Sequence, residues 1–325
     1  MKKNTFNPRR RLLLSSAIGV ALASVFPFKV FAADQVLRIG FQKSSTLIII
    51  IKAKGILEKA FAPLGITVQW NEFTSGLPLL EGLNVGSIDF SADVADPVPL
   101  FAQAAGAQLT YVAQETPSPS AQAILVPKDS PIRSVADLKG KKVAVAKASG
   151  SHYLLLESLK KAGLEWKDIE PAYLQPADGR AAFERGAVDA WVVWEPFVAA
   201  IQNSSSVRVL TDGNFAKVGY RRYYLAATSF ANQYPNVLKL VVDELRKTGE
   251  WVKQNPKEAA EFLGPLVGID AATVAVANSR RSLEVRLVDA QAVAEQQRIA
   301  DQFTAAGLLP KKITISDNPI WVPHH

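Results

Sequence analysis

The sequence has no cysteine among its 325 residues, and this absence excludes several kinds of chemistry. Without thiols the chain forms no disulfide, offers no thiolate nucleophile and supplies no thiolate ligand to a metal. It also has no cysteine that could carry a lipid anchor behind a signal peptide, so we expect a soluble protein that is not tethered to a membrane. A chain of this length can bury enough apolar surface to be stable without cross-links.

Residues that commonly perform catalysis are also scarce. There are three histidines, and two of them, His324 and His325, are the last residues of the sequence. His152 is the third, and a lone histidine is more often a polar contact than a catalytic base. No nucleophile elbow, carboxylate pair or metal-ligand spacing is visible. The sequence therefore predicts a binding protein rather than an enzyme, with no catalytic residues, no metal and no cofactor.

Long apolar runs are limited to the beginning of the chain. A basic stretch that contains Arg9, Arg10 and Arg11 precedes an apolar run over 12–28, and small residues follow at the spacing that a signal peptidase needs. A membrane span needs roughly 20 apolar residues, so this pattern favours a signal peptide over 1–32. The arginines fit either a twin-arginine signal or the general export route. We therefore predict export to the periplasm by one of these two routes.

Basic charge is not in excess once the predicted signal peptide is removed. The whole sequence has 37 lysines and arginines against 30 acidic residues, but six of the basic residues and none of the acidic ones lie within 1–32. The remaining chain therefore holds 31 basic and 30 acidic side chains, a net charge of +1. This balance, with no basic stripe interleaved with aromatic residues, argues against nucleic acid as a partner.

What the sequence does contain is a pattern that occurs twice. An apolar strand, a lysine, a group of small polar residues and a helix follow one another from Val36 and again from Lys142. In a second pair a turn and a helix lead into a strand, with Asp89 in one copy and Asp189 in the other. Open α/β sheets bind ligands beyond the carboxyl ends of their strands. The repeat therefore predicts an α/β protein of two lobes with a ligand cleft between them.

The order of the predicted strands shows where the chain changes lobes. Crossings near 118–122 and 220–224 would form a hinge of two segments. Beyond the second crossing the chain turns helical, with one long helix over 234–255, and these helices are expected to pack against the outside of the first lobe. We expect the protein to be a monomer. The predicted lobes are 33–120 together with 223–325 (lobe I) and 121–222 (lobe II).

Two loops of the repeat carry small polar residues where a helix is predicted to begin. One loop contains Ser44 and Ser45, and the other contains Ser149, Gly150 and Ser151. The start of a helix has unpaired backbone N–H groups and the positive end of the helix dipole, so amides and hydroxyls there can hold a tetrahedral anion. Ordinary helix capping explains each loop alone, whereas a matching pair in two lobes favours an anion site between them.

Other residues at the same strand ends can complete a cleft. Gly76 and Asp178 stand near predicted helix starts, and Arg180 follows on the first turn of the second of these helices. Arg180 can make a bidentate contact to an oxyanion, although an arginine at such a place is more often solvated. Trp194 and Glu195 end an apolar strand, where an aromatic ring can pack on the apolar part of a ligand or belong to the core.

Six stretches of the chain, taken in order, are typical of one known family. They are LRIGFQKSS, LEGLNVGSIDFSAD, PLFAQAAGAQLTYV, SVADLKGKKVAVAKASGSHYLL, PADGRAAFERGAVDAWVVWEPF and LLPKKI. In these stretches, which are spread over nearly the whole chain behind the predicted signal, the sequence resembles the periplasmic substrate-binding proteins of ABC importers, specifically the aliphatic sulfonate-binding group. The resemblance implies a two-lobed periplasmic binding protein fold of type II, the Venus flytrap, with the ligand cleft between the lobes.

The resemblance also implies a function and a set of ligand-binding residues. The protein would close on an alkanesulfonate and deliver it to an ABC permease with its ATPase, for sulfur acquisition. The implied ligand-binding residues are Gln42, Ser44, Ser45, Gly76, Ser149, Gly150, Ser151, His152, Asp178, Arg180, Trp194 and Glu195. We expect Ser149→Ala and Arg180→Ala to weaken sulfonate binding without unfolding the protein.

The sequence departs from the family pattern at the edge of the expected cleft. Val94, Ala95 and Asp96 stand where related proteins often carry a Thr-Gly-acid turn. Gly179 stands where alanine is common, and Glu195 stands where aspartate is common. These departures bear on the organic group of the ligand more than on its class.

Other ligands, and one other class of protein, remain open. Related binding proteins hold taurine, nitrate or a pyrimidine precursor of thiamine, and the sequence does not choose among these ligands. A periplasmic enzyme is the alternative from another class. Recovery of the ligand unchanged after binding would argue for a carrier, whereas a transformed ligand would argue for an enzyme.

Overall fold

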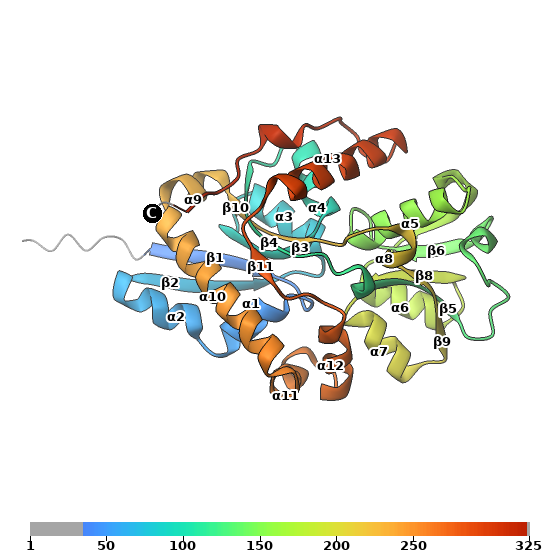
Figure 1. The fold of residues 1–325 in the computed structure, drawn as a ribbon, viewed down its shortest axis with the longest axis horizontal. Helices are drawn as coiled ribbons and strands as arrows, with labels where there is room; N and C mark the ends of the chain where they lie inside the picture. Colours follow the sequence, from blue (N-terminus) through green and yellow to red (C-terminus); the bar gives the residue numbers. More distant parts are fainter. Residues whose placement is uncertain (1–34, 324–325) are drawn as a thin grey trace, which may run out of the picture. The chain divides into compact units, whose positions relative to one another are not determined.

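The computed structural model describes residues 35–323, so the predicted signal peptide at 1–32 and the two terminal histidines lie outside the described residues. The described residues form two mixed sheets that are covered by helices (Figure 1). The first sheet has the strand order β11-β4-β10-β3-β1-β2. Its strands are β1 (Gln35–Phe41), β2 (Ile66–Glu72), β3 (Phe90–Ala95), β4 (Leu109–Glu115), β10 (Arg222–Ala227) and β11 (Val285–Arg286).

The second sheet has the strand order β7-β6-β8-β5-β9. In this sheet β6 is parallel to both of its neighbours, whereas β5 is antiparallel to β8 and to β9. The strands are β5 (Gln122–Pro127), β6 (Lys142–Val145), β7 (Glu170–Tyr173), β8 (Ala190–Trp194) and β9 (Val207–Asp212).

The repeat in the sequence is a repeat of structure. β1 lies between β2 and β3 and is parallel to both, and β6 lies in the same way between β7 and β8. The Asp89 carboxylate accepts a hydrogen bond from the backbone N–H of Arg38 at 2.9 Å. In the second copy the Asp189 carboxylate accepts from the backbone N–H of Lys142 at 2.8 Å. Each aspartate therefore ties the start of the third strand to the first strand, and the carboxyl ends of the three strands meet at one edge.

Helices connect the strands in both lobes. Around the first sheet they are α1 (Thr46–Ala53), α2 (Ile56–Phe61), α3 (Gly76–Asn84) and α4 (Pro97–Ala104), and around the second they are α5 (Gly150–Lys161), α6 (Pro176–Glu184), α7 (Phe197–Ser204) and α8 (Gly213–Ala216). The C-terminal segment contains α9 (Thr228–Gln233), α10 (Pro235–Gln254), α11 (Pro256–Val267), α12 (Ala271–Ser279) and α13 (Ala290–Ala305). Short 3₁₀ helices lie at Ala62–Leu64, Pro119–Ala121, Val135–Leu138, Trp166–Asp168 and Ile315–Asp317.

The chain passes between the two sheets twice. It leaves the first sheet after β4 to enter the second at β5, and it returns from β9 to β10. The two connecting segments are joined by a hydrogen bond of 2.8 Å from the backbone N–H of Ser118 to the carbonyl of Gly219. They lie close to the crossings predicted near 118–122 and 220–224. The lobe boundaries at 120 and 222 stay a prediction, because the described residues fall into one compact unit.

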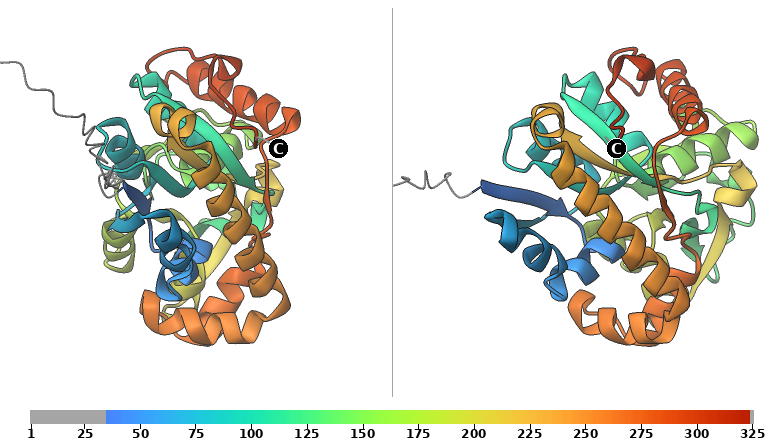
Figure 2. Two further views of the ribbon diagram at one scale, coloured as in Figure 1. Left: turned by 90° about the vertical axis from the view of Figure 1, so that its left-hand side faces the viewer. Right: turned by 60° about the vertical axis from the view of Figure 1, so that its left-hand side comes forward.

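Helices α10 and α11 pack on the first lobe, as predicted, whereas α12 and α13 also contact helices of the second lobe. α1 carries the apolar run from Leu47 to Ile51, and each residue of this run is buried. These side chains share one core with Val241 and Leu245 of α10, which is the long helix predicted over 234–255. Figure 2 shows α10 running over the first sheet, with α11 and α12 at its far end. The polar ends of the sheet's strands are therefore left to face the second lobe.

Within the described part of the chain, no single helix is both long and apolar enough to cross a bilayer. α11 and α12 reach the required length and composition only when they are taken together, across a bend of 115°. Both helices bury residues in the core of the first lobe, among them Leu263 and Val274.

Candidate functional site

Two adjoining cavities lie between the carboxyl ends of the two sheets. The smaller one, which we call the inner pocket, has a volume of about 10 Å³, room for about one water molecule. It is lined by Gln42, Gly76, Ala95, Val98, Ser149, Gly150, Trp194, Tyr220 and Arg222. The larger one, the outer cavity, measures about 450 Å³ and shares Gln42 and Trp194 with the inner pocket.

The strand ends bring these residues together. Gln42 directly follows β1, Ala95 is the last residue of β3, and Trp194 is the last residue of β8. Parallel strands that end at one edge place the following loops at that edge, which is where α/β folds bind their ligands. The cleft that the sequence predicted between two lobes is therefore present, and residues of both sheets line it.

The inner pocket receives the starts of two helices, one from each lobe. Gly76 begins α3 and Gly150 begins α5, and both line the pocket. The first N–H groups of a helix have no acceptor within it, and the helix dipole makes this end positive. A Cβ on Gly150 would lie 2.3 Å from the Tyr220 ring, so only glycine allows this close approach. The pocket can therefore hold an anion with backbone donors from both lobes.

Serine hydroxyls fix the two loops that precede α1 and α5. The Ser149 hydroxyl accepts from the backbone N–H of His152 at 3.2 Å and donates to the Ala146 carbonyl at 2.7 Å. The Ser45 hydroxyl accepts from the backbone N–H of Gln42 at 3.2 Å. The Gln42 side chain in turn donates from Nε2 to the carbonyl of Asp93 at 3.1 Å. These bonds hold Ser149 and Gln42 on the wall of the inner pocket.

Arg222 is the charged residue of the inner pocket, and it is almost fully buried. Its Nε lies 2.6 Å from the Asp93 carboxylate, and its Nη2 donates to the Ser44 hydroxyl at 3.1 Å. Its Nη1 donates to the Tyr220 hydroxyl at 3.1 Å, which leaves one of the two Nη1 hydrogens available to a ligand. Burial is the largest single influence and lowers the pKa of Arg222, but Asp93, Tyr220 and Glu115 together outweigh it and the pKa lies above its ordinary value.

A second buried arginine balances the charge behind Arg222. Arg281, which follows α12, contacts Asp93 at 3.0 Å and Glu115 at 2.6 Å. It also donates to the Ser44 carbonyl at 2.6 Å. The two arginines and the two carboxylates are therefore neutral as a group, so their burial does not leave an uncompensated charge. An anion in the inner pocket would be attracted by Arg222 and by the helix starts, while Asp93 lies behind the arginine.

The outer cavity combines apolar rings with a charged rim. Phe73, Trp194 and Phe197 line it, and the rings of the last two meet edge to face at 6.0 Å. Lys43 and Asp178 lie on its exposed rim. A cavity of this kind can accept an organic group while the inner pocket accepts its charged end.

Seven of the twelve predicted residues line the two cavities. They are Gln42, Ser44, Gly76, Ser149, Gly150, Asp178 and Trp194. Ser45 and Ser151 are fully buried behind these walls and line neither cavity. The small residues at the two helix starts therefore lie at one edge of both lobes, where some line a cavity and others are buried behind its wall.

Arg180 does not point into the cleft, contrary to its predicted role. Its Nε pairs with Glu184 at 2.9 Å, one turn further along α6, and its Nη2 donates to the Ser204 hydroxyl at 2.8 Å. The side chain is about one-third exposed. Of the two interpretations of Arg180, the structure therefore agrees with a side chain that lies on the surface and not with one that contacts an oxyanion.

His152 belongs to the first turn of α5, and its ring points away from both cavities. Its ring packs edge to face on Trp166 with centroids 4.6 Å apart, and it also contacts the rings of Phe101, Tyr173 and Phe303. Burial, with a smaller contribution from Lys147, lowers the pKa of His152 to about 3. A neutral ring in an apolar environment is not a group that meets a ligand anion directly.

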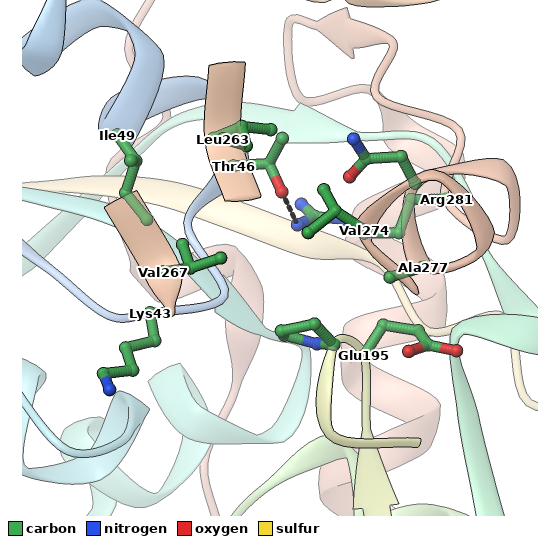
Figure 3. A pocket seen from close by; sticks show the side chains of 11 residues that line it. Lys43, Thr46, Ile49, Glu195, Leu263, Val267, Val274, Ala277 and Arg281 are labelled. Carbon is green, nitrogen blue, oxygen red and sulfur yellow. Dashed lines mark hydrogen bonds between the residues drawn. The ribbon is translucent and has the colours of Figure 1, made fainter. Parts of the chain in front are cut away.

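Glu195 also faces away from the inner pocket and the outer cavity. One of its oxygens accepts from the backbone N–H of Ala199 at 3.0 Å, and the other forms an ion pair with Arg280. A hollow of about 20 Å³ separates Glu195 from α1, α11 and α12, and Figure 3 shows Arg281 and Thr46 on its opposite side. Burial raises the pKa of Glu195, while the bond from Ala199 and the pair with Arg280 oppose this shift.

Among the family departures, Gly179 has a local explanation. A Cβ on Gly179 would lie 2.7 Å from Nε1 of Trp191, so glycine at this position accommodates the indole ring. A Cβ on Gly150 would lie 3.1 Å from the Cβ of Ala95, which shows how closely the end of β3 approaches the start of α5. Asp96 is buried, and its carboxylate accepts from the backbone N–H of Arg221 at 3.2 Å.

Sequence reasoning missed Arg222 and Tyr220, the two hinge residues that line the inner pocket. The available signal was an arginine pair at the head of an otherwise apolar strand, where the chain returns to the first sheet. Arginines are rarely buried without a charged partner, so such a pair within an apolar strand indicates an internal ion pair. That partner, Asp93, lies more than a hundred residues earlier in the sequence and only the fold brings it close.

The chain is similar to known proteins along most of its length. A family model described as NMT1/THI5 like matches residues 47–259. The chain is 40% identical over 316 residues, 97% of each chain, to an aliphatic sulfonates-binding protein of Escherichia coli (strain K12).

Two solved structures have the same fold. The alkanesulfonate-binding protein SsuA from Xanthomonas axonopodis pv. citri, bound to MOPS, matches with a TM-score of 0.83 and 39% identity over 88% of this chain and 98% of that chain. The periplasmic aliphatic sulphonate binding protein SsuA from Escherichia coli matches with a TM-score of 0.81 and 40% identity over 90% of this chain and 94% of that chain. These matches confirm the predicted two-lobed fold.

Proposed function

The chain belongs to the NMT1/THI5-like family and, within it, to the aliphatic sulfonate-binding proteins, and from this premise we propose that it captures an aliphatic sulfonate in the inner pocket and outer cavity. The observation that carries the proposal is the meeting of Arg222 with the starts of α3 and α5 at one small pocket. Beside this pocket lies a cavity with apolar walls. A charged head and an organic body would each find a matching environment.

The chemistry of a sulfonate suits these donors. A sulfonate is fully ionised at any pH at which the protein is folded, so its site needs donors and needs no acceptor for a ligand proton. Arg222, Gln42 and the first amides of α5 provide such donors, and charge-assisted bonds of this kind are stronger than neutral ones. Arg222 and Arg281 balance the carboxylates of Asp93 and Glu115, so one added anion is not repelled by an uncompensated carboxylate.

Binding would require the lobes to open and close. Residues of the first sheet and of α5 both line the inner pocket, and its volume of about 10 Å³ is smaller than a sulfonate group. The two lobes must therefore separate slightly to admit the ligand and close again around it. A ligand favours closure only through a higher affinity for the closed form, which contacts from both lobes provide.

The proposal extends to the partners and the location of the protein. We propose that the ligand-loaded protein is a monomer in the periplasm that delivers the sulfonate to an ABC permease with its ATPase, for sulfur acquisition. The similar SsuA protein of Escherichia coli is periplasmic, which supports this location. Recognition of the loaded form by a permease would depend on both lobes presenting their surfaces together.

Isothermal calorimetry on the purified chain tests the ligand. The panel contains ethanesulfonate, hexanesulfonate, taurine, sulfate, nitrate and a thiamine-precursor pyrimidine, with each compound checked by NMR after incubation. We expect the alkanesulfonates to bind with the highest affinity and to be recovered unchanged. Stronger binding of taurine would make the ligand an amino-bearing sulfonate, stronger binding of sulfate, nitrate or the pyrimidine would exclude a sulfonate as the ligand, and a transformed compound would indicate an enzyme.

A further inference from the structure

The loop between β6 and α5 contains a residue in an unusual backbone conformation. Ala148 has φ of +62° and is fully buried. The left-handed region is disfavoured for residues that have a Cβ, so the surrounding structure must hold Ala148 there. The next two residues, Ser149 and Gly150, line the inner pocket. The conformation of Ala148 therefore decides where the start of α5 stands relative to the pocket.

One residue, His152, contacts this loop with both its side chain and its backbone. Nδ1 of His152 accepts a hydrogen bond from the backbone N–H of Ala148 at 3.2 Å. The backbone N–H of His152 itself donates to the Ser149 hydroxyl at 3.2 Å. Ala148 and Ser149 are thus each tied to the same residue of the first helical turn.

Close packing holds the ring of His152 in the position where it accepts from Ala148. It is fully buried, and the rings of Trp166, Tyr173 and Phe303 pack on it with centroids 4.6, 5.7 and 5.1 Å away. Burial keeps the ring neutral, since the pKa of His152 lies near 3. A neutral imidazole that accepts at Nδ1 carries its proton on Nε2, and Nε2 has no polar partner among residues 35–323.

We propose that His152 is a positioning residue, which holds Ala148 in its left-handed conformation and so places Ser149 and Gly150 at the inner pocket without contacting the ligand. The inference deepens the proposed function, because it assumes that the inner pocket holds the ligand anion. It replaces the direct contact that the sequence predicted for His152.

Packing alone is the competing explanation, and the two differ in what they require of the side chain. A packing role needs an apolar body of the right volume, which leucine approximates. A positioning role needs an acceptor at the place of Nδ1, which Oδ1 of asparagine provides and leucine does not. It also requires that the hydrogen bond from Ala148 to the ring of His152 offset the free-energy cost of the left-handed conformation. Ala148→Gly removes that cost, because glycine adopts positive φ without strain.

The experiment compares three variants in their affinity for hexanesulfonate: His152→Leu, His152→Asn, and His152→Leu combined with Ala148→Gly. We expect His152→Leu to weaken binding about tenfold, the typical effect of losing a buried hydrogen bond together with a backbone constraint. His152→Asn should stay within about threefold of the parent protein, and Ala148→Gly should recover most of the loss in the leucine background. Equal weakening by leucine and asparagine, with no recovery by glycine, would overturn the proposal.

A second readout works without any ligand. In the parent protein the ¹⁵N spectrum of His152 should show a neutral ring with its proton on Nε2, assigned by its absence from His152→Asn. Amide exchange at Ala148 should be about tenfold faster in His152→Leu than in the parent protein. A protonated Nδ1, or unchanged exchange, would contradict the proposal even if a variant fails to fold well enough for calorimetry. Should the parent protein bind no sulfonate, the proposed function fails while these two measurements still decide the role of His152.

Discussion

Arg280 forms an ion pair with Glu195, and this pair joins the end of α12 to the residue that follows β8. The next residue along the chain, Arg281, turns the other way and pairs with Asp93 in the first sheet. Two consecutive arginines therefore connect the end of β8 in the second sheet to β3 in the first sheet. Glu195 is also the neighbour of Trp194, whose ring lines both ligand cavities. We therefore expect the pair to contribute to the proposed closure of the lobes.

Arg280→Met should weaken the binding of hexanesulfonate about tenfold. The variant removes a charge-assisted bond, worth about 1.5 kcal/mol or more, that the lobes are expected to make only when closed. Calorimetry measures the affinity, and small-angle scattering measures the fraction of closed protein. Arg286→Met is the control, since it breaks the exposed pair with Glu284. Equal affinity in both variants would show that the pair does not bear on closure.

Arg222→Met should abolish most sulfonate binding and also destabilise the fold. The variant removes the charged donor of the inner pocket and leaves Asp93 with Arg281 as its remaining cation, which costs about 3–5 kcal/mol when a buried pair is broken. Arg222→Lys keeps the charge but loses the planar fork, so its affinity should fall between that of the parent protein and that of Arg222→Met.

Arg221→Met provides the matched control for Arg222. Arg221 is the preceding residue and pairs with Glu295 at 2.7 Å, and it does not line the pocket. Its loss should lower the thermal stability without lowering the affinity for hexanesulfonate. If Arg221→Met and Arg222→Met lower the affinity to the same extent, the effect at Arg222 comes from loss of stability and not from loss of a ligand contact.

The fold was predictable from sequence because the repeat is visible in local patterns. Strand, small polar loop and helix recur at Val36 and Lys142, and the two aspartates of the repeat make equivalent hydrogen bonds to the first strands. A parallel strand arrangement then fixes which edge carries the loops. The edge of the sheet that carries the candidate site therefore follows from the pattern alone.

Individual site residues were less predictable, because side-chain direction depends on partners that are distant in sequence. Arg222 turns inward toward Asp93, whereas Arg180 is drawn outward by Glu184 and Ser204. His152 is directed behind its helix by a group of aromatic rings that includes Phe303, near the end of the chain. Glu184 lies four residues from Arg180 on the same helix and was a local signal for an outward arginine, whereas the partners of Arg222 and His152 are distant in sequence and give no local signal.

Arg180→Ala should leave sulfonate affinity unchanged, in contrast to the expectation from sequence. The structure pairs Arg180 with Glu184 on the surface, and exposed pairs of this kind contribute about 0.2–1 kcal/mol. Ser149→Ala should weaken binding severalfold and cost about 1 kcal/mol of stability, because it removes the cap of α5 at the pocket wall. Calorimetry and urea unfolding on the two variants check both results. A larger loss of affinity from Arg180→Ala than from Ser149→Ala would mean that the cleft extends over the outer face of α6.

Asp96 should make the protein less stable as the pH rises. Burial, with a further contribution from the negative charge of Glu295, raises the pKa of Asp96 to about 8 in the folded protein. An unfolded aspartate has a pKa of about 4, so between about pH 4 and pH 8 the folded state keeps a proton that the unfolded state loses. The free energy of unfolding should therefore fall with rising pH in this window, by at most about 1.4 kcal/mol per pH unit, and level off above it.

The variant Asp96→Asn isolates this contribution, because the amide has the same shape and does not titrate. Urea unfolding of both proteins at a series of pH values from about 5 to about 9 gives the difference in their free energies of unfolding. The stability of the asparagine variant relative to the parent should increase steadily up to about pH 8, where the Asp96 carboxyl ionises in the folded protein, and then remain constant. Since Asp96 lies beside the head of β10 and bonds to the Arg221 backbone, a pH-independent difference would mean that this carboxylate is already ionised in the fold, with Arg221 as its counter-ion.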